Sequence, residues 1–156
     1  MTAPSILPLG QYLLDLSFEN FLLDNPAPAP VVQVNVNVEA RSLTPNDAGE
    51  TANGDYESIL ILKITGLRMT ADNQPDVNGK PAFITELRYA GRYRFADIPR
   101  QDCEPFLLIE APRMLFPFAR QIVADSAAHG GMASLLLAPV DFAQLYMQQR
   151  GKPAAA

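Results

Sequence analysis

The clearest pattern in the chain is the alternation of apolar and polar residues over positions 31–41, which is strict from Val32 onward. Valine occupies every second position from Val32 to Val38, followed by Ala40, while polar or charged residues fill the positions between. A period of two places the two sets on opposite faces of an extended chain. The segment is therefore predicted to be a β-strand with one buried face.

Three further segments predict strands. Residues 11–21 alternate imperfectly, and residues 56–69 are apolar on both sides, as in a central strand. Residues 82–95 alternate again. In the first of these segments, one side holds Leu14, Leu16 and Phe18, and the other side holds Leu13, Asp15, Ser17 and Glu19. The second side is acidic and is expected to face solvent, and the short links between the four strands favour an antiparallel meander.

After Ile98 the apolar residues recur with a period of about 3.6, which is typical of helices. We expect a short helix at 101–108 and a longer one that begins near Pro112 and runs to residue 129. Pro112 and Pro117 fall early in the longer helix, and the Gly-Gly pair at 130–131 ends it. A third helix is predicted at 141–150, with Asp141 as its N-cap.

Strands followed by helices indicate an α+β fold, in which two main helices pack on one face of a four-stranded antiparallel sheet. The whole chain, 1–156, is expected to be one domain with flexible ends at 1–10 and 150–156. Apolar residues occur on both sides of the second, third and fourth strands. Because one helix layer covers only one face, association with a second copy is expected.

The charge distribution argues for a protein partner rather than a nucleic acid. The net charge is −5, and the first 60 residues hold eight acids but only one base, Arg41. Such a surface repels nucleic acids and anionic lipids and attracts basic proteins. The one cysteine, Cys103, cannot form an internal disulfide, and neither a signal peptide nor an apolar run of membrane-spanning length is evident. These features predict a soluble cytoplasmic protein without direct membrane insertion.

Few residues are suited to catalysis, since the chain has one histidine, His129. Asp125 lies one helical turn earlier and could hydrogen-bond to it, but no third group completes an active site, so a structural role is preferred. We expect no catalytic or metal site and no cofactor. A small-molecule-binding or enzymatic α+β domain that uses Asp125 and His129 remains the alternative.

A run of arginines and aromatic residues at 88–95 superficially suggests nucleic-acid binding. The arginines are Arg88, Arg92 and Arg94, and the aromatic residues are Tyr89, Tyr93 and Phe95. In a strand the two sets lie on opposite faces, so they cannot form one stacking platform, and nucleic-acid binding is not expected. The chain does carry more Phe, Leu and Met residues than one small core uses, which suggests a groove for extended apolar segments.

Four segments resemble the SecB family of bacterial protein-export chaperones. They are YLLDLSFEN at 12–20, PAFITELRYAG at 81–91, LFPFAR at 115–120 and LLLAPVDFAQLYMQQ at 135–149. The resemblance implies a homotetramer built as a dimer of dimers. It also implies clients, which are unfolded precursors of exported proteins, and delivery of these clients to the SecA motor without hydrolysis of ATP by the chaperone.

The resemblance also implies roles for individual residues. The SecA-binding positions are Asp15, Glu19, Ile84 and Glu86; the oligomer interface holds Thr85, Leu87 and Tyr89; and clients contact Val34, Val36, Val38, Leu135, Leu136 and Leu137. Longer family members end in an acidic tail that binds SecA, whereas this chain ends in QQRGKPAAA. SecA contact is therefore expected through the sheet, the alternative being that the given sequence lacks its natural end. A purely structural oligomer and a chaperone dedicated to one partner, such as an antitoxin, remain open.

Overall fold

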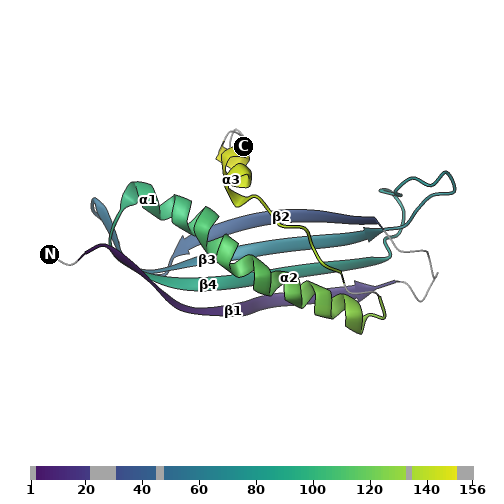
Figure 1. Cartoon of the computed structure of the whole chain (residues 1–156), viewed down its shortest axis with the longest axis horizontal. Helices are drawn as coiled ribbons and strands as arrows, with labels where there is room; N and C mark the ends of the chain where they lie inside the picture. Colours follow the sequence, from purple (N-terminus) through teal and green to yellow (C-terminus); the bar gives the residue numbers. More distant parts are fainter. Residues whose placement is uncertain (1–2, 22–30, 45–47, 133–134, 151–156) are drawn as a thin grey trace.

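A computed structural model describes residues 3–21, 31–44, 48–132 and 135–150 (Figure 1). Its strands are β1 (Ser5–Asn20), β2 (Val31–Ser42), β3 (Thr51–Leu67) and β4 (Phe83–Pro99). They form one antiparallel sheet, and helices cover one of its faces. The predicted α+β fold with a four-stranded antiparallel sheet is confirmed.

The strand order is β1-β4-β3-β2, so the predicted meander is correct only for the last three strands. β1 lies beside β4 and forms one edge of the sheet, while β2 forms the other edge, as in a Greek key. Alternation within a strand does not reveal its neighbours, which is why the sequence pattern missed this arrangement. The ten residues between Asn20 and Val31 can reach across three strand spacings, which add up to about 14 Å.

β1 is longer and less regular than its sequence suggested. It begins at Ser5, so residues 5–10, which were expected to belong to a flexible end, pair with β4. Bulges between Pro8 and Gly10 and between Leu13 and Asp15 shift its register. The second bulge places Leu13 opposite Tyr89, on the face that the helices cover, and not beside Asp15 as the alternation predicted.

The helical part runs continuously from residue 100 to residue 129. It consists of α1 (Arg100–Pro105), a π-helical turn, η2 (Phe106–Glu110), and α2 (Ala111–His129), where two separate helices were expected. Pro112 has no backbone N–H to continue the α-helical ladder, and the preceding N–H, that of Ala111, bonds to the Phe106 carbonyl in π register.

The predicted end of α2 at the glycine pair and the predicted N-cap of α3 are confirmed. After α2, the N–H groups of Gly131 and Met132 bond to the carbonyls of Ala128 and Ala127, and Gly131 has a φ of 81°. This is a Schellman motif. The last helix, α3 (Phe142–Arg150), begins after Asp141, whose Oδ1 accepts the Gln144 N–H at 3.0 Å. No helix in the described part of the chain is long and apolar enough to span a membrane.

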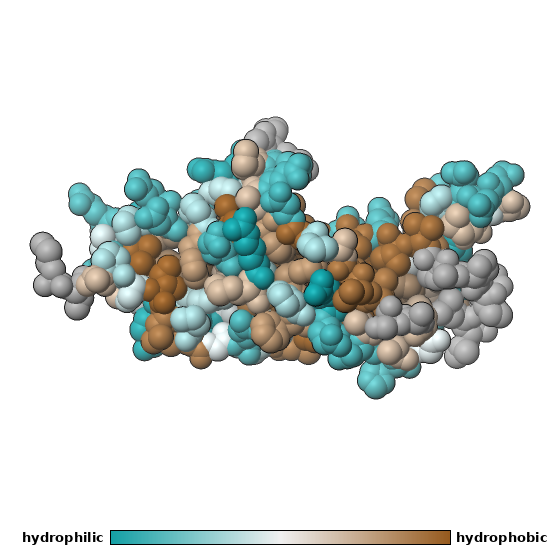
Figure 2. All heavy atoms as spheres, in the orientation of Figure 1, coloured by the Kyte–Doolittle hydropathy of each residue, from teal (hydrophilic) through white to brown (hydrophobic). Residues whose placement is uncertain are grey.

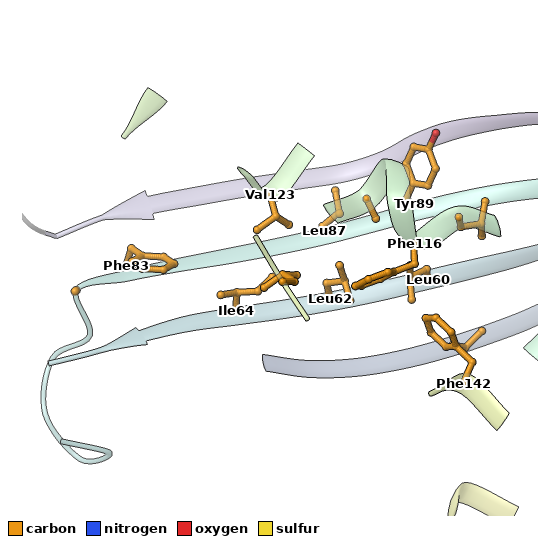
Figure 3. Close-up of a cluster of buried hydrophobic side chains, with 14 residues drawn as sticks. Leu60, Leu62, Ile64, Phe83, Leu87, Tyr89, Phe116, Val123 and Phe142 are labelled. Atoms are coloured by element: carbon orange, nitrogen blue, oxygen red, sulfur yellow. The ribbon is translucent and has the colours of Figure 1, made fainter. Parts of the chain in front are cut away.

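The main core lies between α2 and the two central strands (Figure 3). β3 contributes Leu60, Leu62 and Ile64, which are completely buried. α3 joins this core through Phe142, which is 1% exposed. Its ring lies edge to face with that of Phe116 of α2, and the ring centroids are 6.0 Å apart. A second, aromatic cluster around Tyr93 and Phe95 lies beneath α1 and η2.

Candidate functional site

The strand registers divide the sheet into a helix face, which α2 crosses, and an open face on the other side. The open face is charged. Asp55 of β3 is only 7% exposed there and receives hydrogen bonds from Arg92 and Arg94 of β4. The shortest of these is 2.6 Å from Arg92 Nη2, and Arg94 Nε lies 2.8 Å away. The bonds from Arg94 and Arg92 lower the pKa of Asp55 to about 2.

A second buried acid, Glu57, links three strands on the open face. It is 3% exposed and accepts hydrogen bonds from Arg41 Nε of β2, at 2.6 Å, and from the Tyr12 hydroxyl of β1. Burial, followed by this bond to Glu57, raises the pKa of Tyr12 to about 12. The arginines at 88–95 lie on the open face and the aromatic residues on the helix face, as predicted.

The predicted SecA-binding residues lie together on the open face, at one end of β1 and β4. Asp15 stands opposite Arg88, and Glu19 stands opposite Ile84. Glu86 is exposed and lies two residues along β4 from Ile84, with Lys63 Nζ at 3.5 Å. We call Asp15, Glu19, Ile84 and Glu86 the acidic patch.

The predicted client-binding residues lie on the helix side, but only some are accessible. Val34 of β2 is 39% exposed and Leu136 is 69% exposed, whereas Val38 and Leu137 belong to the core. Val36 and Leu135 are half-buried and pack against that core. Met147 of α3, to which the sequence analysis assigned no binding role, is 70% exposed. Figure 2 shows apolar surface between α3 and the loop that joins β3 to β4.

The predicted oligomer-interface residues are buried within the chain itself. Thr85, Leu87 and Tyr89 face the helix layer and are 1%, 1% and 9% exposed. Tyr89 stacks on Phe118 of α2 at 6.5 Å, and Phe118 is 54% exposed. Sequence reasoning correctly placed the three residues opposite the acidic patch but did not anticipate that the chain's own helix covers them.

Exposed leucines on β1 were missed as a possible contact surface. Leu7, Leu9, Leu13, Leu14 and Leu16 are 38–57% exposed. The first two were overlooked because residues 1–10 were expected to be flexible. Met114, on the outer side of α2, is 40% exposed.

Asp125 and His129, the alternative site, are not joined by any hydrogen bond in the described structure. Asp125 Oδ1 accepts a bond from Gln121 Nε2 at 2.9 Å. His129 lines a cavity of about 370 Å³ together with Phe18, Asn20, Ser126 and Gly130. Within residues 3–21, 31–44, 48–132 and 135–150, no three His, Cys, Asp or Glu side chains are placed to hold a metal.

Comparisons with known proteins agree with one another. The family model described as "Preprotein translocase subunit SecB" matches residues 2–152. A relative named protein-export protein SecB, from Azorhizobium caulinodans, is 42% identical over 95% of this chain and 84% of its own. One of the same name from Xanthobacter autotrophicus is 40% identical, over 96% and 90% of the two chains.

Among solved structures, the chain is similar to a SecB-like chaperone from Mycobacterium tuberculosis in complex with a peptide from an antitoxin. The two share 11% identity, with a TM-score of 0.61 over 86% of this chain and 87% of the other. At this identity the likeness concerns the fold.

Proposed function

Because the chain belongs to the SecB family and is therefore a chaperone of the Sec export pathway, we propose that it holds unfolded precursors of exported proteins and delivers them to SecA. The family is not enzymatic, so the reading of Asp125 and His129 as an active site is set aside. Precursors are made in the cytoplasm, and we propose that the protein works there.

The observation that carries the proposal is the separation of two surfaces by one sheet. Accessible apolar residues, among them Val34, Leu136 and Met147, lie apart from the acidic patch on the open face. A client can therefore occupy one surface while a basic region of SecA meets the other. Weak apolar contacts along one client chain add together through high effective concentration, and charges steer the partner.

Two sets of substitutions test this separation. Replacing both Asp15 and Glu19 with lysine, which reverses their charge, should weaken SecA binding in a titration and leave the arrest of client refolding intact. Leu136→Asp should weaken refolding arrest and leave SecA binding intact. Val77→Asp is the matched control, because Val77 is 67% exposed but lies in the loop joining β3 to β4. The proposal fails if each variant loses both activities, or if the native protein arrests no client.

We further propose that the protein is a homotetramer, a dimer of dimers. The exposed leucines of β1, with Met114 and Phe118 on α2, supply an apolar surface that a second copy would bury. In this proposal Thr85, Leu87 and Tyr89 act indirectly, by supporting α2 from below. Light scattering should give four times the chain mass of 17.0 kDa, and Phe118→Glu should lower that mass.

The range of clients distinguishes a general chaperone from one dedicated to a single partner. A general chaperone should arrest the refolding of several unrelated denatured proteins. Arrest of only one would indicate a dedicated role, and a tetramer that arrests none would be a structural oligomer.

A further inference from the structure

The side chains of the open face form rows that run across the sheet. The strand registers place one such row in the order Asn37 of β2, Ile61 of β3, Arg88 of β4 and Asp15 of β1. Arg88 therefore stands between the acidic patch at one edge of the sheet and β2 at the other edge. The direction in which its side chain points decides how much negative charge the patch presents.

Arg88 turns away from the acidic patch. Its Nη2 group donates to Oε2 of Glu39 on β2, at 3.3 Å, and not to Asp15, the residue directly opposite on β1. Asp15 is exposed, and in the described part of the chain no hydrogen bond or ion pair engages its carboxylate. Cross-strand neighbours lie only about 5 Å apart, well within the reach of an arginine. Asp15 thus stays unpaired although a cation stands beside it.

The apolar surface of β3 favours this direction. Two isoleucines, Ile59 and Ile61, lie between the partners of the ion pair. Ile59 is only 3% exposed although it faces the open side. The aliphatic part of an arginine is stabilised by lying over apolar side chains while its guanidinium group stays in water. Arg88 meets both conditions by crossing β3 to reach Glu39.

Lys63 shows the outcome where β2 supplies no acid. It stands opposite Asn35 of β2 and Glu86 of β4. Asn35 has no charge, and Nζ of Lys63 lies 3.5 Å from Oε1 of Glu86. The chain itself therefore partly neutralises Glu86, a member of the acidic patch. Asp15 escapes such neutralisation because Glu39 competes for the neighbouring cation.

We propose that Glu39 is a positioning residue for SecA docking: it holds Arg88 across β3 and so leaves Asp15 available to a basic group of the partner. The inference rests on the proposed function and concerns how the acidic patch is kept accessible. Glu39 acts through Arg88, because β2 and β1 are opposite edges of the sheet, about 14 Å apart (Figure 1). Solvent ions largely screen a direct effect over that distance, since the Debye length is about 8 Å at physiological salt.

Titration of SecA with the full-length protein tests the proposal through Glu39→Gln. The released Arg88 should pair with Asp15 and weaken SecA binding about three- to fivefold, the range expected for one exposed ion pair. Glu110→Gln is the matched control, because Glu110 is also half exposed and pairs with an arginine, Arg113, at 2.7 Å, but lies in the helix layer. It removes the same charge and should change SecA binding less than about 1.5-fold.

Combining substitutions separates positioning from direct contact. In a chain that carries Arg88→Gln, Glu39→Gln should change SecA binding less than about 1.5-fold, because no cation is left to release. If Glu39 contacted the partner itself, its loss would weaken binding with or without Arg88, and the proposal would be wrong. Asp15→Asn should weaken binding about three- to fivefold in the native chain but less than about 1.5-fold in the Glu39→Gln chain, where Arg88 already occupies Asp15.

Two further readouts distinguish positioning from a general structural role of Glu39. Glu39→Gln should leave the arrest of client refolding unchanged and the melting temperature within about 2 °C of the native value. Loss of client arrest together with SecA binding would overturn the positioning role. SecA binding that is equally tight in the native protein and in Glu39→Gln would overturn the inference while the proposed function stands. If the native protein does not bind SecA, both fail.

Discussion

Replacing Asp55 with asparagine tests whether the open face stabilises the fold through its buried acid. Asp55 accepts hydrogen bonds from Nε and Nη2 of Arg92, at 3.1 and 2.6 Å, and from Nε and Nη2 of Arg94, at 2.8 and 3.2 Å. The arginine side chains are about half exposed, so water recovers part of the loss. We expect the free energy of unfolding at pH 7 to fall by about 2 kcal/mol.

The pKa of Asp55 supports the same magnitude. A fall from 3.8 to about 2 corresponds to about 2 kcal/mol. Because the pKa is lower in the folded state, this stabilisation is complete above pH 4 and is lost as the pH falls from about 4 to about 2. The asparagine side chain binds no proton in this range. Between pH 4 and pH 2 the variant should therefore lose about 2 kcal/mol less of its free energy of unfolding than the native protein does.

Urea unfolding, followed by circular dichroism, measures both effects, since the chain has no tryptophan. All samples need the same protein concentration, because association would add to the apparent stability. Glu86→Gln is the matched control: Glu86 lies on the same face, but its ion pair with Lys63 is 3.5 Å long and half exposed, and should contribute less than about 0.5 kcal/mol. Equal losses in the two variants, or parallel pH profiles below pH 4, would refute the argument.

Three further substitutions probe the core. Tyr93→Phe should raise the melting temperature by a few degrees in a thermal scan, because the buried hydroxyl has no partner in the described structure. Gly66→Ala should destabilise the protein by about 2 kcal/mol in urea, because the added methyl group would meet the Phe83 ring. Phe142→Ala should lower the free energy of unfolding by about 3 to 5 kcal/mol or release α3, which would be seen as faster amide exchange in that helix. Met147→Ala, at an exposed position of the same helix, should have neither effect.

Sequence periodicity predicted the elements of the fold but not their arrangement. Three strands follow from alternation that can be read locally and the third, β3, from a run that is apolar on both sides. The glycine pair after His129 and the Asp141 cap follow from turn and capping chemistry. The position of β1 beside β4 depends on which long-range pairing buries more surface, and no local pattern records this. The bulge after Leu13 moves that side chain to the helix face, and the local pattern does not record this bulge either.

For the acidic patch, the sequence pattern predicted the face and the exposure of the residues, whereas for the other two sets it predicted the face but not the burial. A period of two is enough to place Ile84 and Glu86 on one face, and the β1 register brings Asp15 and Glu19 to that face. Burial is harder to predict, because it depends on where α2 crosses the sheet. Leu87 and Leu137 are buried for this reason, although their sequence neighbours Glu86 and Leu136 are exposed.

The ion pairs of the open face also explain why apolar surface remains on the helix side. Asp55, Glu57 and their arginine partners make the open face polar, so that it does not need a second layer to cover apolar side chains. In the described part of the chain the helix face is covered by α1 and η2, by α2, which crosses the sheet diagonally, and by the nine-residue α3, which is anchored by Phe142 (Figure 1). This cover is incomplete over β2, where Val34 stays exposed. A longer α3 would cover Val34 and remove apolar surface on which the proposed client binding depends.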